Sequence, residues 1–315
     1  MVVALSTFLT GLSQSYWQLL VFRSFGGVGS MAFSVSANAV LMRTVTNDLR
    51  GRAQATYNSG FLIGGISGPA FGGVLSAISL RIPFFVYTAT LIIAGSVGLI
   101  YLTEKNLIHR HDMPVKSDSV KFRDAIKLFP YQAALVFGFL TNWVLYGLRN
   151  SILPLFVRNQ LHSTIAAVGY GFTLSAIVQG LCLVFVGKLS DQKGRKFLLY
   201  IGWISIIAAD LVLAAANSAT YYYISMAVFG IGSAFMSTGH ANVVGDLFGG
   251  RAPKAIASWQ MAGDAGMIVG PIVLGALADT HSYRTAFLAS CIFFSTSIFF
   301  ILKMKETRVA SGPSS

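Results

Sequence analysis

Two stretches decide the fold of this chain: Phe25-Gly26-Gly27-Val28-Gly29-Ser30 and Phe229-Gly230-Ile231-Gly232-Ser233. In each, an aromatic residue opens a glycine-rich run, and an Ala-Asn pair follows, at Ala37-Asn38 and at Ala241-Asn242. Further echoes keep the same offset of about two hundred residues: Gly51-Arg52-Ala53 with Gly250-Arg251-Ala252, Gly68-Pro69 with Gly270-Pro271, and Arg81 and Phe84 with Arg284 and Phe287. Such a repeat predicts a protein built from two related halves.

The composition places these halves in a membrane. Apolar residues make up 54% of the chain, charged residues make up 11%, and the mean hydropathy is +0.67, which excludes an ordinary soluble domain. A helix needs about 20 apolar residues to cross a bilayer. The sequence contains a partial span, Met1 to Thr10, and nine full spans: 15–42, 53–78, 81–102, 130–158, 164–187, 197–216, 219–245, 253–278 and 283–303.

The net charge of +12 reflects how the chain is oriented in the membrane, because most of the 23 Lys and Arg residues lie in every second loop. All but five lie in the segments 43–52, 105–127, 188–196, 251–254 and 303–308. Cytoplasmic loops are rich in Lys and Arg, so we expect these segments and the C-terminus to be cytoplasmic, and no binding of nucleic acid. The outward loops contain no Asn-x-Ser/Thr sequon, which favours the plasma membrane of a bacterium, the inner membrane.

This pattern predicts four regions: a helical half at 1–103, a central cytoplasmic loop at 104–129, a six-helix half at 130–306 and a cytoplasmic tail at 307–315. Cys182 and Cys291 both fall within apolar spans, so no disulfide is implied. The sequence shows no phosphate-binding Gly-x-x-x-x-Gly-Lys-Ser/Thr loop, no metal-ligand cluster and no nucleophile elbow. It therefore predicts no enzyme, no metal site and no cofactor.

Two glycine-containing segments indicate conformational roles. In Gly187-Lys188-Leu189-Ser190-Asp191-Gln192-Lys193-Gly194-Arg195-Lys196, Gly187 would allow two helices to converge, Gly194 permits a sharp turn, and Asp191 can stabilise a neighbouring helix N-terminus as a releasable latch. The alternative is an ordinary basic turn.

In the other segment Gly60, Gly64, Gly68 and Gly72 form a smooth strip for close packing of a helix, followed by Gly73, and Pro69 bends the helix. We interpret that segment as a gate; the alternative is the general abundance of Gly and Pro in membrane helices.

Away from the span ends, three charged residues lie inside the spans in addition to Arg149. Arg23 costs at least a few kcal/mol in lipid and so marks a functional site, with snorkelling as the alternative. Asp264 shares a helix face with Gln260, and a desolvated carboxylate can carry a proton. It is either a substrate or proton site or a hydrogen-bonded structural residue. For Asp210 we expect a structural partner.

Together the paired halves, the charged central loop and these motifs resemble the major facilitator superfamily of secondary transporters, over essentially the whole chain. The segment 60–73 resembles the Gly-x-x-x-Gly-Pro-x-x-Gly-Gly signature of its drug:proton antiporter branch, and 187–196 resembles its cytoplasmic loop signature, from which Gln192 departs. The resemblance implies twelve helices in two halves, of which the first two and part of the third are expected to be missing here. This predicts an all-α fold with about ten transmembrane helices.

The resemblance also implies a solute cavity lined by the helices at 15–42, 130–158 and 219–245. Two sets of residues share a helix face there: Asn142, Tyr146 and Arg149, with Trp143 adjoining, and Ser233, Met236, Ser237 and His240. Mixed aromatic, thioether and weakly polar walls suit bulky amphiphilic solutes, whereas plain helix packing is the alternative. Arg23 resembles the arginine that the family links to proton transfer, although its acidic partner on the first helix is not in this chain.

We therefore expect a monomeric, proton-driven exporter of drugs or amphiphilic small molecules, working by alternating access between two halves. Its partners would be the solute, protons and the lipid bilayer, and its energy source the proton gradient. One alternative is a transporter of the same fold for a sugar, organic anion or other metabolite. Another is a truncated membrane protein that transports nothing.

Overall fold

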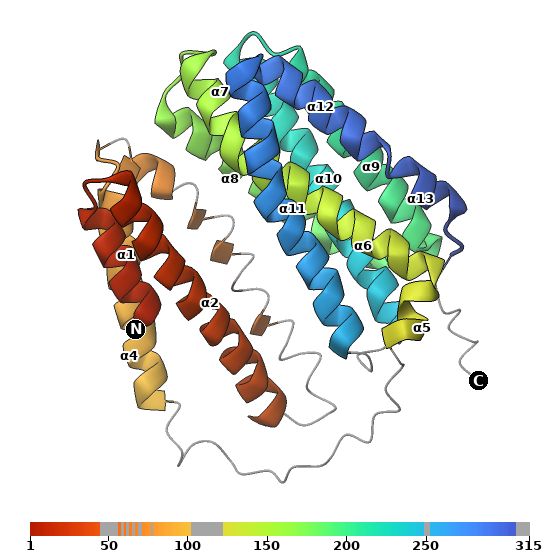
Figure 1. The fold of residues 1–315 in the computed structure, drawn as a ribbon, viewed down its shortest axis with the longest axis horizontal. Coiled ribbons are helices and arrows are strands. Elements are labelled where there is room, and N and C mark those ends of the chain that lie inside the picture. The colour runs from red at the N-terminus through yellow and green to blue at the C-terminus, as the bar shows by residue number, and fades with distance from the viewer. Residues whose placement is uncertain are drawn as a thin grey trace. The chain divides into compact units, whose positions relative to one another are not determined.

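The computed structural model describes residues 1–44, 56, 57, 60, 63, 64, 67, 68, 71–76, 78–101, 122–248 and 253–306. All regular secondary structure in these residues is helical (Figure 1). The chain divides into two compact units, Met1–Val115 and Lys116–Ser315. Each unit has its own helix packing.

The first unit contains α1 (Val2–Leu12), α2 (Tyr16–Thr44) and α4 (Ile82–Tyr101), and α1 packs against both α2 and α4. The hydroxyl of Ser6 on α1 donates a hydrogen bond to the carbonyl of Phe22 on α2. At Gly26 a Cβ atom would lie 2.6 Å from the Ser6 Oγ. The glycine run of the first repeat therefore allows α2 to approach α1 closely.

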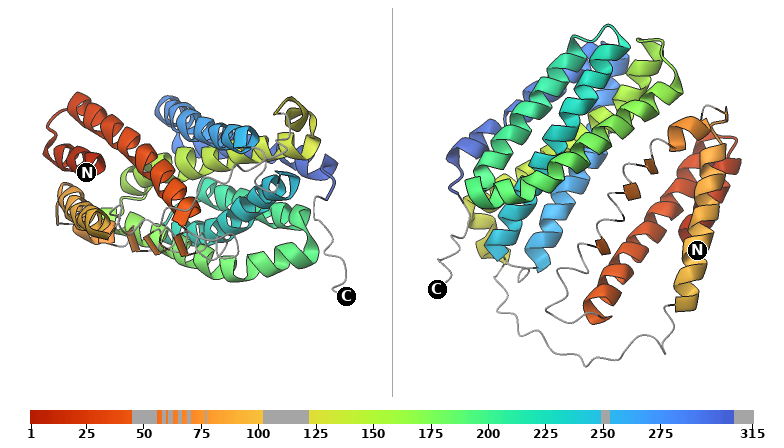
Figure 2. Two further views of the ribbon diagram at one scale, coloured as in Figure 1. Left: turned by 90° about the horizontal axis from the view of Figure 1, so that it is seen from below. Right: turned by 180° about the vertical axis from the view of Figure 1, so that it is seen from behind.

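The second unit contains the six spans predicted between residues 130 and 303, preceded by the short α5 (Phe122–Lys127) (Figures 1 and 2). The predicted span 130–158 is divided into α6 (Phe129–Asn142), a π-helix η1 (Trp143–Ile152) and α7 (Leu153–Asn159). The remaining helices are α8 (Ile165–Lys193), α9 (Arg195–Ala214), α10 (Ala219–Phe248), α11 (Pro253–Thr280), α12 (Tyr283–Ser295) and α13 (Ile298–Lys303).

Helix α10 lies at the centre of one set of contacts, against α9 and α8, while α11 packs against η1 and α6. The glycine run of the second repeat serves the α10 contacts, because a Cβ atom at Gly230 would lie 2.5 Å from the backbone oxygen of Ser175 on α8. Both copies of the repeat thus bring a helix backbone close to its neighbour. Small residues have this role in membrane helices, where interhelical attraction depends on close packing.

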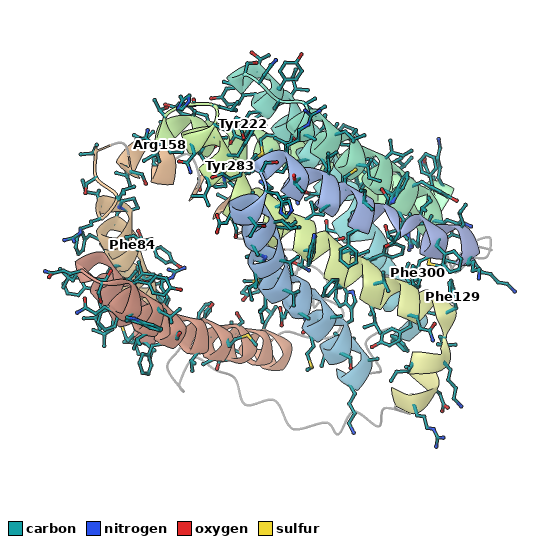
Figure 3. All side chains as sticks on the ribbon, turned by 45° about the horizontal axis from the view of Figure 1, so that its top comes forward. Phe84, Phe129, Arg158, Tyr222, Tyr283 and Phe300 are labelled. Carbon is teal, nitrogen blue, oxygen red and sulfur yellow. The ribbon has the colours of Figure 1, made fainter. Side chains whose placement is uncertain are left out.

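Aromatic side chains fill the interior of the second unit. Tyr131 on α6 is fully buried, and its hydroxyl donates a hydrogen bond of 2.8 Å to the carbonyl of Ala255 on α11. Its ring meets that of Phe248 edge to face, with centroids 5.3 Å apart. Near one end of the unit, Phe129 on α6 stacks on Phe300 on α13 at 6.0 Å (Figure 3). These contacts join the first and last helices of this half.

Among the described residues, five helices are long and apolar enough to cross a membrane: Ile82–Tyr101, Ile165–Lys193, Arg195–Ala214, Lys254–Thr280 and Tyr283–Lys303. The helices α2 and α10, with 29 and 30 residues, are long enough but are not in this set. Gly, Ser, Tyr and His residues lower the hydropathy of α10. Most of the predicted span 53–78 lies outside the described residues.

Candidate functional site

One polar cluster surrounds the turn between α8 and α9. Gly194 makes the turn with φ 90° and ψ 170°, a conformation that residues with a Cβ rarely adopt. The Glu306 carboxylate accepts hydrogen bonds from the backbone N–H groups of Arg195 at 2.8 Å and Lys196 at 3.1 Å. These N–H groups have no partner within α9 because they belong to its first turn. Glu306 therefore caps α9 and places a negative charge at the positive end of the helix dipole.

The guanidinium of Arg195 is the centre of the same cluster. Its Nε and Nη2 atoms donate to the two carboxylate oxygens of Asp246 on α10, at 2.8 and 3.3 Å. Its Nη1 atom donates to Asp191 at 3.0 Å and to the hydroxyl of Ser190, which also accepts from Asn242 at 3.0 Å. The side chains of Arg195 and Asp246 are 12% and 17% exposed, whereas that of Asp191 is 76% exposed. Asp246 is thus the better shielded partner.

The cluster differs in composition from the sequence-based interpretation. The carboxylate at the N-terminus of α9 is that of Glu306, and Asp191 pairs instead with the Arg195 side chain. Asp246 was not singled out, although it follows Asn242 of the repeat motif by four residues and so shares its helix face. Gly187 is exposed, and a Cβ atom there would meet no described atom within 4 Å. The close helix approach expected at Gly187 is thus not found among the described residues.

The predicted glycine strip is only partly described. A Cβ atom at Gly60, Gly64, Gly68 or Gly72 would meet no described atom within 4 Å. Gly73 is half-buried in the described segment 71–76, and Pro69 lies outside the described residues. No close partner for the strip is therefore found in the described part of the first unit, and the gating role stays a prediction.

The predicted cavity face on 130–158 is divided by the π-helix. The Asn142 amide donates to the carbonyl of Gly138 at 2.9 Å, and a Cβ atom at Gly263 on α11 would lie 2.7 Å from the amide nitrogen. Arg149 instead lies over Phe172 of α8, with its Cζ 5.0 Å from the ring centroid. A π-helix has a wider turn than an α-helix, so the expected i, i+4, i+7 alignment does not hold. Asn142 contacts α11, whereas Arg149 contacts α8.

Close contact between η1 and α11 accompanies this change of register. A Cβ atom at Gly147 would lie 2.7 Å from the backbone carbon of Gly270, and one at Gly270 would lie 3.0 Å from the Trp143 oxygen. Trp143 is buried and meets Phe293 of α12 edge to face at 5.0 Å, while Tyr146 is half-buried. Trp143 therefore belongs to the packing between helices.

The four predicted cavity residues on α10 are mostly internal. Met236 is fully buried, and its backbone nitrogen would lie 2.8 Å from a Cβ atom at Gly202 on α9. Ser233 is buried, and the half-buried Ser237 donates to its carbonyl at 2.6 Å. The buried ring of His240 lies 5.5 Å from that of Trp259 on α11, and neither ring nitrogen of His240 has a hydrogen-bond partner among the described residues.

The intramembrane acids occupy two different environments. Asp264 and Gln260 are both exposed on α11, on the surface of the second unit. Asp210 is fully buried on α9, and neither of its carboxylate oxygens has a hydrogen-bond partner among the described residues. The structural partner expected for Asp210 is therefore not found in this part of the chain. Arg23 is exposed in the first unit.

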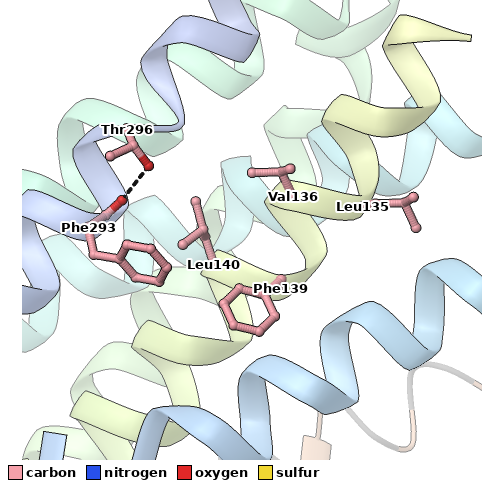
Figure 4. Close-up of a pocket in the computed structure, with 6 residues that line it drawn as sticks. All are labelled: Leu135, Val136, Phe139, Leu140, Phe293 and Thr296. Carbon is pink, nitrogen blue, oxygen red and sulfur yellow. Dashed lines mark hydrogen bonds between the residues drawn. The ribbon is translucent and has the colours of Figure 1, made fainter. Parts of the chain in front are cut away.

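The second unit also contains an apolar cavity of about 320 Å³ between α6 and α12 (Figure 4). Thr296 contributes the only side-chain hydroxyl of its lining, and that hydroxyl already donates to the Phe293 carbonyl at 2.7 Å. None of the predicted solute-binding residues lines this cavity. No group of three or more His, Cys, Asp or Glu side chains suited to a metal ion is found within the described ranges.

The family model described as Major Facilitator Superfamily matches residues 1–149 and 135–315. The multidrug resistance protein MdtG of Proteus mirabilis is 25% identical over 308 residues, covering 93% of this chain and 74% of that protein. Multidrug resistance protein 1 of Bacillus subtilis is 29% identical over 151 residues, covering 48% of this chain and 39% of that protein.

Among solved structures, a bacterial homologue of the human lysosomal transporter Spinster, in an inward-facing and unoccupied conformation, matches with a TM-score of 0.73 and 16% identity. The match covers 96% of this chain and 80% of that one, and at this identity it shows the fold alone. The helical spans, the repeated halves and the family match lead to one conclusion: the chain belongs to the Major Facilitator Superfamily and is a multi-pass membrane transporter.

Proposed function

We propose that this transporter exports amphiphilic small molecules in exchange for protons, by alternating access of its two halves. The observation that carries the proposal is the similarity to relatives named multidrug resistance proteins, which extends over 93% of the chain for the one from Proteus mirabilis. We further propose that the protein acts as a monomer in the bacterial inner membrane with a cytoplasmic C-terminus. The five basic segments support this orientation.

Arg23 and Asp264 are proposed as the proton-coupling residues. Both lie in predicted spans, both are exposed on the surface of their unit, and neither has a hydrogen bond or ion pair with a described residue. A charge inside the bilayer costs at least a few kcal/mol, by translocon scales about 2.5–3.5, so it is retained mainly where it functions.

The cluster around Arg195 is proposed as the conformational latch, with Asp191 as its exposed member. Hydrogen bonds among Arg195, Asp246 and Glu306 join the start of α9 to the cytoplasmic ends of α10 and of the segment after α13. Charged hydrogen bonds are about twice as strong as neutral ones. A change at the exposed Asp191 therefore leaves the hydrogen bonds of Arg195 with Asp246 and Glu306 intact, while it alters the charge at the surface of α8.

Transport of a fluorescent amphiphile into inverted membrane vesicles with an acidic interior tests the proposal. We expect the wild-type chain to accumulate the probe, and an ionophore that collapses the pH gradient to release it. Asp264→Asn removes the titrating group and is expected to abolish accumulation driven by the pH gradient. Asp279→Asn is the matched control, because Asp279 is exposed on the same helix α11 but near its end.

Arg23→Ala is likewise expected to abolish the gradient-driven flux, and Arg23→Lys to retain part of it because Lys keeps the charge. A correctly folded wild-type sample without any flux driven by the pH gradient would refute proton-coupled export. Unchanged coupling in Asp264→Asn would refute the role given to that carboxylate, while leaving export itself intact.

A further inference from the structure

Arg149 is a buried cation for which the described part of the chain offers no counter-ion. Its side chain lies on η1 and is 8% exposed, and its Nε atom is fully buried without a hydrogen-bond partner. No ion pair or hydrogen bond joins its guanidinium to a described residue, and its neighbouring titratable groups are the phenols of Tyr146 and Tyr222. The other Lys and Arg residues of the chain lie in predicted loops or at the ends of predicted spans, except Arg23, which is exposed.

Four acidic residues of the chain lie outside the described ranges. The chain has 11 Asp and Glu residues, and those not described are Asp48, Glu104, Asp112 and Asp118. All four lie in segments predicted to be cytoplasmic. Phe172 lies seven residues into α8 and Tyr222 three residues into α10, so at 1.5 Å per residue they are about 10 and 5 Å from the opposite, outward helix ends. Arg149 lies at the level of these two rings.

Two helices, α8 and α10, bring aromatic side chains to the guanidinium on η1. Phe172 on α8 presents its ring face to the Cζ atom at 5.0 Å. The fully buried Tyr222 on α10 already donates its hydroxyl to the carbonyl of Val168 at 2.9 Å, so its phenol is held in place. In Figure 3, Tyr222 lies toward the same end of the second unit as Arg158. A cation–π contact offsets part of the cost of burying a cation but leaves the guanidinium N–H donors free.

We propose that Arg149 binds the anionic group of an amphiphilic solute, a carboxylate, sulfonate or phosphonate, while Phe172, Tyr146 and Tyr222 contact its apolar body. The inference deepens the proposed function and rests on it for the step of transport, but not for binding. A guanidinium fork matches the paired oxygens of such anions. No carboxylate among the described residues competes for the guanidinium, so a bound solute can supply the anion. The phosphate of an anionic lipid has the same chemistry.

Binding of tritiated dodecanesulfonate to the purified full chain tests this site. The protein is placed in nanodiscs of zwitterionic phosphatidylcholine, and the probe is used below its micellar concentration. Dodecyltrimethylammonium and dodecanol share the same chain length and differ only in the head group. We expect saturable binding of the sulfonate that Arg149→Gln weakens about tenfold to hundredfold, which corresponds to the loss of a charged hydrogen bond. Arg149→Lys retains the charge but not the forked guanidinium. Its affinity for the sulfonate is expected to lie between those of the wild type and Arg149→Gln.

Arg158→Gln is the matched control, because it removes the same charge at an exposed position near the end of α7, nine residues beyond Arg149. It is expected to leave sulfonate binding unchanged. Dodecanol binding is expected to be the same in all variants, which shows that Arg149→Gln is folded. Sulfonate binding that is unaffected by Arg149→Gln, or equally weakened by Arg158→Gln, would overturn the proposal.

A second arm adds phosphatidylglycerol to the nanodiscs. Displacement of the sulfonate by this lipid in the wild type, and not by added phosphatidylcholine, identifies a lipid head group as an occupant of the same anion site. Absence of displacement identifies a soluble anion as the occupant. Transport of a neutral amphiphile in inverted vesicles separates the two proposals: flux without Arg149-dependent binding refutes the anion site alone, whereas binding without flux refutes the exporter alone.

Discussion

Replacing Asp246 by Asn tests whether the Arg195 cluster holds the second unit together at the turn between α8 and α9. The change keeps the size of the side chain and removes the charge that faces Nε and Nη2 of Arg195 at 2.8 and 3.3 Å. Both side chains are shielded, at 12% and 17% exposure. A hydrogen bond to a charged group contributes about 1.5–3 kcal/mol, and some accessibility to water remains, so we expect a loss of about 2 kcal/mol in the free energy of unfolding.

Asp191→Asn is the internal comparison, because the Asp191 carboxylate lies 3.0 Å from the same guanidinium but is 76% exposed. Exposed ion pairs contribute about 0.2–1 kcal/mol. For domains of 150–250 residues, about 1 kcal/mol shifts Tm by roughly 2–4 °C. We therefore expect Tm to fall by roughly 4–8 °C for Asp246→Asn and by at most about 4 °C for Asp191→Asn.

The two cysteines of the chain provide the assay, since Cys291 is buried and Cys182 is half-buried. A thiol-reactive fluorophore added during heating of the purified protein in detergent reports unfolding as the thiols become accessible. An equal or larger effect of Asp191→Asn would refute the reasoning. A double-mutant cycle provides the second check: in the Arg195→Gln background, the effect of Asp246→Asn should largely disappear because the two groups interact directly.

Three further predictions concern the same unit and use the same melting assay. Glu306→Gln removes the charge that caps α9 and should cost about 0.5–1 kcal/mol, whereas no change in Tm would contradict the capping role. Gly266→Ala places a Cβ atom against the backbone oxygen of Phe139 and should lower Tm strongly. Gly275→Ala is its control and should leave Tm unchanged, because a Cβ atom there would meet no described atom within 4 Å. Equal effects of the two changes on Tm would be inconsistent with close α6–α11 packing. Asp210→Asn should leave Tm unchanged or raised, because no described donor stabilises the buried carboxylate, and a clear fall would indicate an unseen partner.

The positions of the second-half helices follow closely from hydropathy. The predicted spans 164–187, 197–216 and 219–245 correspond to α8, α9 and α10, and their ends differ mainly where polar residues extend the helix. In lipid the backbone must satisfy its hydrogen bonds internally, so a long apolar segment forms a helix. The turn at Gly194 was also predictable, because a positive φ favours glycine.

The direction in which individual side chains point could not be predicted as reliably as the positions of the helices. Arg149 was placed on one face with Asn142 on the assumption of a regular α-helix, and the π-helix at Trp143–Ile152 separates them. Met236 is indistinguishable from a cavity-lining residue by sequence, yet it is fully buried against α9. In a membrane helix both the lipid face and the packed face are apolar, so hydropathy alone carries little information about direction.

The sequence by itself determined that this chain is a duplicated helical membrane protein, because span length, charge distribution and repeated motifs are local or periodic properties. Only the tertiary structure decided which groups meet. Glu306 and Asp246 reach Arg195 from positions 111 and 51 residues away, and the paired glycines at 147 and 270 bring η1 against α11. The same packing leaves Arg149 and Asp210 buried without a described counterpart. Such pairings depend on how helices cross, which is set by many side chains together and not by the residues that finally touch.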